Sequence, residues 1–177
     1  MKKRLYLWQF SGFLFTGITG ILLHFLYEWT SQNRIVALFS AVNESIWEHM
    51  KLLFFPMLIF AIIESRYIGN KYGNFWCAKL VGIVLGVSII PILYYTYTGI
   101  FGITVDWFNI AIFFIAAATS YIVETNILKN QKTFFFSCGV AKVILFLIIV
   151  LFVIFTFTPP EIALFQDPAT KLYGISI

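Results

Sequence analysis

Residues 134–158 read FFFSCGVAKVILFLIIVLFVIFTFT, a run in which Lys142 is the single charged residue. A hydrocarbon core about 30 Å thick is crossed by roughly 20 apolar residues in helical form, so this run predicts a membrane-spanning helix over Phe134–Thr158. Four more stretches meet the same requirement. They are Leu5–Tyr27, Ile46–Ser65, Asn74–Tyr97 and Asp106–Thr125.

The composition of the whole chain agrees with a membrane protein. Of its 177 residues, 60% are hydrophobic and 11% are charged, whereas soluble domains carry about 25% charged residues. The net charge of +4 comes from cations at the ends of apolar segments and not from a basic stripe, so no nucleic-acid partner is expected. We therefore expect residues 1–177 to form a single integral membrane domain in contact with the lipid bilayer.

The expected fold class is all-α, a polytopic membrane bundle of five transmembrane helices. The connection between the first two spans contains the apolar segment Ile35–Val42, which is too short to cross the membrane. It predicts a short interfacial or re-entrant helix at this place.

The positions of lysine and arginine predict the orientation. Nine of the twelve cations lie near the ends of spans that would share a side with the N-terminus, and three lie on the other side. Because cytoplasmic loops carry the excess of cations, the N-terminus is expected in the cytoplasm and the C-terminal tail 159–177 outside. Cys77 and Cys138 would then both lie near the cytoplasm, so no disulfide is expected.

Ionisable residues gather at the predicted outer ends of the first two spans. His24 and Glu28 continue, at spacing four, a small-residue stripe on the first span, and such a stripe faces protein. The second span has an apolar part, Leu52–Ile63, only about 18 Å long, so the polar residues before it must enter the outer leaflet. Ionisable groups at that depth normally face the bundle interior. The candidate ligand-binding residues are His24, Glu28, Glu44, Ser45, Glu48, His49, Lys51, Asp106 and Asp167.

Three chemistries are open to this set. A divalent metal could be held by His24, Glu48 and His49, but adjacent residues of a helix point about 100° apart and there is no HExxH motif. A hydrolase could be drawn from Ser45, His49 and Glu48, without a nucleophile elbow to support it. A pocket for a small polar or cationic ligand, or for a lipid head group, needs no special motif, and the outer carboxylates favour a cation.

Each polar residue also has a structural interpretation. Ser45 and Glu48 fit a capping box, and Lys51 could pair with Glu44 or Glu48. On the inner side, Glu64 and Glu124 are expected to form interfacial ion pairs with nearby cations. Those cations are Arg66, Lys129 and Lys142.

The C-terminal segment Phe165–Ile177 is too apolar for a free tail in water. It either folds back over the outer mouth of the bundle, covering the polar residues, or lies along the membrane interface.

Two motifs carry a resemblance to known proteins. Residues 39–51, FSAVNESIWEHMK, and the later Phe165-Gln166-Asp167-Pro168 followed by Tyr173-Gly174 resemble a family of small bacterial multi-pass membrane proteins of unknown function. The resemblance covers nearly the whole chain and implies a bacterial cytoplasmic (inner) membrane location. It implies no activity and no residue role.

Three functions remain open on this basis. The first is a non-catalytic or transport-related membrane module with an outward-facing polar pocket. The alternative is a membrane-embedded hydrolase, with or without a divalent metal cofactor, acting on lipid or envelope substrates. The third is a structural subunit with a protein partner in a membrane complex.

Overall fold

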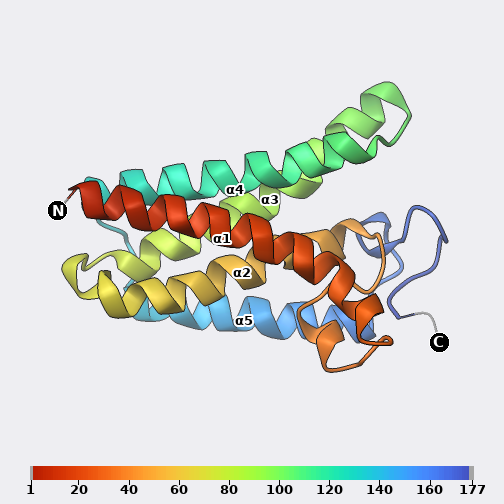
Figure 1. The fold of residues 1–177 in the computed structure, drawn as a ribbon, viewed down its shortest axis with the longest axis horizontal. Coiled ribbons are helices and arrows are strands. Elements are labelled where there is room, and N and C mark those ends of the chain that lie inside the picture. The colour runs from red at the N-terminus through yellow and green to blue at the C-terminus, as the bar shows by residue number, and fades with distance from the viewer. Residues whose placement is uncertain (1, 176–177) are drawn as a thin grey trace.

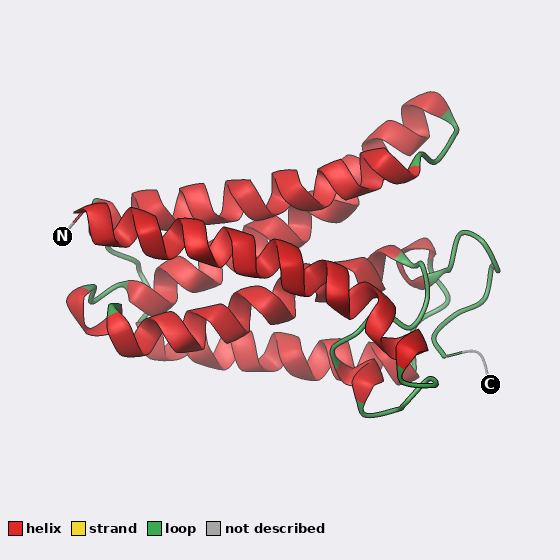
Figure 2. Ribbon diagram, in the orientation of Figure 1, coloured by secondary structure: helices red, strands yellow, loops and turns green. Residues whose placement is uncertain are grey.

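Five long helices form the protein, and the computed structural model describes residues 2–175 (Figures 1 and 2). The helices are α1 (Lys2–Trp29), α2 (Ile46–Tyr67), α3 (Phe75–Phe101), α4 (Asp106–Lys129) and α5 (Cys138–Phe157). Each is long and apolar enough to cross a membrane. Even α5, with 20 residues, spans about 30 Å. The predicted architecture is confirmed, and every predicted helix end lies within four residues of the observed one.

Different segments of the chain lie at the two ends of the bundle, which we call the near end, where the N-terminus lies, and the far end. The near end carries the N-terminus, the short 3₁₀ turn η2 (Gly69–Lys71) and the connection from α4 to α5 (Figure 1). The far end carries the loop 30–45 and the tail 158–175. In the loop, the predicted short helix is a single 3₁₀ turn, η1 (Val36–Leu38), and the tail contains a second one, η3 (Ala163–Phe165).

Small residues allow close packing around α4. A Cβ on Gly82 of α3 would collide with the Glu124 side chain, and one on Gly12 of α1 would collide with Tyr121. Between these contacts the Thr16 hydroxyl and the Tyr121 hydroxyl form a hydrogen bond of 2.9 Å. Gly12 of α1 and Gly82 of α3 therefore serve packing within the bundle. The outer faces of α1 and α5 are rich in exposed apolar side chains, which suit contact with lipid.

The near end holds a buried charge cluster that corrects one prediction. Lys79 lies 2.6 Å from a Glu64 carboxylate oxygen and 2.5 Å from one of Glu124, and Gln9 donates a hydrogen bond of 2.7 Å to Glu64. All four side chains are buried. The expected pairing of these two carboxylates with Arg66, Lys129 and Lys142 is wrong, because both glutamates point into the bundle, toward the one lysine that α3 places there.

Lys142 and the two cysteines complete the near end. The Lys142 ammonium lies over the Trp76 ring, 5.3 Å from its centroid. Cys77 and Cys138 are joined by a disulfide, with their Cα atoms 5.0 Å apart, so the prediction of no disulfide is wrong. That prediction rested on the compartment alone, whereas α3 and α5 begin at the same end of the bundle and bring the two residues together.

Candidate functional site

The far end of the bundle is organised by the turn that leads into α2. The Asn43 side chain accepts a hydrogen bond from the Ser45 amide, and the Ser45 hydroxyl then caps α2 by accepting from the Glu48 amide. The capping role predicted for Ser45 is confirmed. The Glu48 carboxylate does not complete a capping box, because the Ser45 amide is bonded to Asn43 instead.

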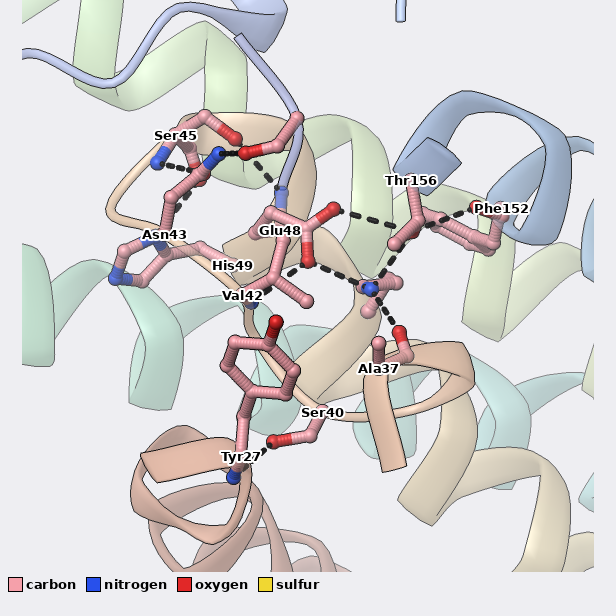
Figure 3. Close-up of polar contacts among 12 residues, drawn as sticks. Tyr27, Ala37, Ser40, Val42, Asn43, Ser45, Glu48, His49, Phe152 and Thr156 are labelled. Carbon is pink, nitrogen blue, oxygen red and sulfur yellow. Dashed lines mark hydrogen bonds and ion pairs between the residues drawn. The ribbon is translucent and has the colours of Figure 1, made fainter. Parts of the chain in front are cut away.

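Glu48 and Lys51 form a buried ion pair one turn into α2 (Figure 3). Their charged atoms are 2.6 Å apart, and their side chains are 3% and 0% exposed. Glu48 also accepts from the Val42 amide and from the Thr156 hydroxyl, and Lys51 donates to the Ala37 carbonyl and to the Thr156 hydroxyl. The pair is thus fully hydrogen-bonded and ties α2 to the loop and to α5, which gives it a structural role.

His49 points away from this pair, as the helical spacing of adjacent residues requires (Figure 3). Its Nδ1 lies 2.9 Å from the Ser45 carbonyl oxygen. A carbonyl can only accept, so Nδ1 carries the proton and, in the neutral ring, Nε2 is left with a free lone pair. That Nε2 faces Glu44, 3.5 Å from a carboxylate oxygen.

His24 of α1 meets the same carboxylate oxygen of Glu44. Its Nε2 is 3.8 Å from Glu44 Oε2, and the two imidazole rings lie edge to face with centroids 5.3 Å apart. One potential ligand atom from each of His24, Glu44 and His49 lies within 4.8 Å of the other two. The geometry therefore assembles two of the three residues predicted as metal ligands and replaces Glu48 with Glu44.

Two adjoining cavities of about 250 and 330 Å³ open beside this cluster. Both are lined by Glu44 from the turn before α2, by His49 near the start of α2, and by Asp106, Asn109 and Phe113 from α4. The larger cavity also reaches His24. The start of α4 therefore supplies a second carboxylate to the space that the histidines face.

The tail lies over the same end of the bundle. Trp47 of α2 packs against Phe165, with ring centroids 4.8 Å apart, and Asn43 donates a hydrogen bond to the Gly174 carbonyl. Pro168 and Ala169 line the smaller cavity, and the Asp167 carboxylate shapes their turn by accepting from the Ala169 amide. The described part of the tail folds back over the mouth, which is the first of the two arrangements expected from the sequence, and residues 176 and 177 are not among the described residues.

The structure separates the candidate residues into three groups. His24, Glu44, His49 and Asp106 border the cavities. Glu48, Lys51 and Ser45 serve the cap and the buried ion pair, and Asp167 serves the tail turn. Glu28 is exposed and lines neither cavity.

The hydrolase set drawn from Ser45, His49 and Glu48 is not assembled as a triad. The His49 ring contacts the Ser45 carbonyl and not its hydroxyl, and Glu48 is paired with Lys51. Sequence reasoning also missed Thr156, which links both members of the buried pair. A threonine three residues before the Pro159-Pro160 pair carries no signal of that role in the sequence.

Comparison with known proteins gives a family and no described activity. No curated protein matches the chain, and no solved structure matches it. A family model described as a family of unknown function, DUF6512, matches residues 2–175. That match covers almost all of the five-helix bundle and both motifs at its far end. The chain belongs to this family of unknown function.

Proposed function

We propose that this integral membrane protein binds a small cation, free or carried on a lipid head group, in the cavities at the far end. The observation that carries the proposal is the charge of the cavity lining. Glu44 and Asp106 line both cavities, and neither a lysine nor an arginine occurs among the described lining residues. Lys51, the nearest cation along α2, is already neutralised by Glu48. Two carboxylates in a partly enclosed space that no lysine or arginine lines attract a cation.

The walls of the larger cavity support access from the bilayer. Besides the polar residues, Ile21 and Phe25 of α1 and Ile110 of α4 line it, and these three side chains are 43–58% exposed on the outside of the bundle. An amino head group could therefore enter with its acyl chains lying along α1 and α4.

The location that we propose is the bacterial cytoplasmic membrane, with the N-terminus in the cytoplasm and the far end outside. The cation asymmetry of nine against three supports this orientation. The cavities would then take their ligand from the outer leaflet or from the space beyond it.

The test is ligand-dependent stability of the full chain purified in detergent. Unfolding is measured with ethanolammonium, Mg²⁺, Ca²⁺ or Zn²⁺, each as its chloride. A bound cation at 100 times its Kd stabilises the fold by about 2.7 kcal/mol. Glu44→Gln and Asp106→Asn should reduce that gain, whereas Glu161→Gln, which neutralises an exposed carboxylate of the tail, should leave it intact.

The measurements distinguish a failed proposal from a bound cation, and a lipid head group from a soluble ligand. If none of the four cations stabilises the unsubstituted protein more than it stabilises the Glu44 and Asp106 variants, the proposal is wrong. Nanodiscs of phosphatidylethanolamine, compared with phosphatidylglycerol, distinguish the sources of an amine. Stabilisation by the lipid alone identifies a head group, and stabilisation by free ethanolammonium identifies a soluble ligand.

A further inference from the structure

The cation pocket contains a more specific arrangement, formed where α1 meets the turn before α2. One carboxylate oxygen, Glu44 Oε2, faces an imidazole nitrogen from each of two helices, His24 Nε2 of α1 and His49 Nε2 of α2. Two imidazole nitrogens and one carboxylate oxygen form a ligand set that binds transition metals in preference to Mg²⁺ and Ca²⁺. Those two ions take oxygen ligands.

The distances are close to those of a coordinated ion. A tetrahedral ion with ligands about 2.0–2.2 Å away holds its ligand atoms about 3.4 Å apart. The Glu44 oxygen lies 3.5 Å from His49 Nε2 and 3.8 Å from His24 Nε2, and each of the three residues offers a ligand atom within 4.8 Å of those of the other two. The Glu44 side chain is 53% exposed and that of His24 is 32% exposed, so both can shift toward a bound ion without disturbing the core.

The surroundings of His49 prepare it as a ligand. The Ser45 carbonyl holds the proton on Nδ1, so Nε2 presents its lone pair toward His24 and Glu44. Metal-binding histidines characteristically donate their second ring nitrogen to such an acceptor, which fixes the tautomer and the ring orientation. The helix cap at Ser45 therefore orients a ligand as well as starting α2.

The charge of the pocket matches a divalent ion. Imidazoles bind a metal ion in their neutral form, so the charge of the site comes from Glu44 and Asp106, two carboxylates that line the same cavity. One divalent cation balances them. A set of three protein ligands also leaves a coordination position for water or for a molecule in the cavity.

We propose that His24, Glu44 and His49 bind one divalent transition-metal ion, with Zn²⁺ the best match to the ligand types. This inference rests on the cation pocket proposed above and names its ligand. Glu48, expected from the sequence as the carboxylate ligand, takes no part, because its two oxygens are occupied by Lys51, Val42 and Thr156.

The experiment measures metal binding directly on the tag-free full chain in detergent, after stripping with a chelator. Equilibrium dialysis against Zn²⁺, with the metal quantified by elemental analysis, should give one ion per chain. His24→Gln, Glu44→Gln and His49→Gln should each weaken binding at least tenfold, whereas Glu161→Gln should bind as the unsubstituted protein does. Unfolding of each chelator-treated variant checks that the substitution has not simply disrupted the fold.

A second readout does not depend on any variant. Co²⁺ added to the stripped protein should give the intense visible absorption of a tetrahedral site, and Zn²⁺ should abolish it. Absence of both stoichiometric Zn²⁺ and this spectrum, or equal binding by all four variants, would overturn the metal site. If ethanolammonium or Ca²⁺ still stabilises the protein through Glu44, the cation pocket stands without the metal, and if nothing binds, both proposals are wrong.

Discussion

Replacing Lys51 with methionine tests the buried pair that positions the start of α2. The substitution keeps most of the side-chain volume but removes the cation 2.6 Å from Glu48. The carboxylate, with a side chain only 3% exposed, must then stay charged without a partner or take up a proton. Leaving one member of a buried pair charged costs about 3–5 kcal/mol.

The protonation route sets an upper limit on that cost. An unfolded glutamate loses its proton near pH 4.3, so keeping the group protonated at pH 7 costs about 3.7 kcal/mol. We therefore expect Lys51→Met to lower the free energy of unfolding by about 3–4 kcal/mol at pH 7. The folded variant would hold a proton that the unfolded chain lacks, so its stability relative to the unsubstituted protein should fall by about 1.4 kcal/mol per pH unit above pH 4.3.

The assay is unfolding in mixed micelles titrated with a denaturing detergent, followed by tryptophan fluorescence between pH 5 and pH 7. At pH 5 the penalty should shrink to about 1 kcal/mol. The double variant Glu48→Gln/Lys51→Met carries no charge at this site, so it should be more stable than Lys51→Met at pH 7 and show no added pH dependence. A penalty for Lys51→Met that stays the same across this range, or strict additivity of the two substitutions, would refute the reasoning.

Three other expectations concern the membrane topology and the near end. In a cysteine-free background, an impermeant thiol reagent applied to intact cells should label a cysteine at Thr170 and miss one at Asn130, and the reverse pattern would invert the proposed orientation. Cys77 and Cys138 are bonded in the structure, so alkylation of acid-quenched cells should find neither thiol free until a reductant is added, and two free thiols in unreduced cells would contradict the bond. Lys79→Met leaves two buried carboxylates unpaired and should destabilise the fold by about 3–5 kcal/mol, while Lys142→Met removes an exposed cation and should change the unfolding midpoint little.

The helices could be predicted because hydropathy reports length and composition directly. The pairing of charges could not, because it depends on helix rotation. The place of Lys79 early in its span indicates the membrane surface at the near end, yet α3 turns the side chain inward between two glutamates. The adjacency of Glu48 and His49 correctly indicated that they face different partners. It could not indicate that Glu44, one residue before the helix cap, would join the histidines, because that depends on the turn held by Asn43.

The two buried charge clusters impose an order on how the chain enters the bilayer. Glu48 and Lys51 lie three residues apart on one helix, so α2 can bring both across as a neutral unit. At the near end the partners come from separate helices, and synthesis delivers Glu64 first, Lys79 next and Glu124 last. An isolated charge in hydrocarbon is costly. Glu64 of α2 can pair with Lys79 as soon as α3 is made, before Glu124 of α4 has been synthesised. The helical hairpin of α2 and α3, rather than any single span, is the smallest part of this chain that can leave the insertion machinery with the Glu64 charge compensated.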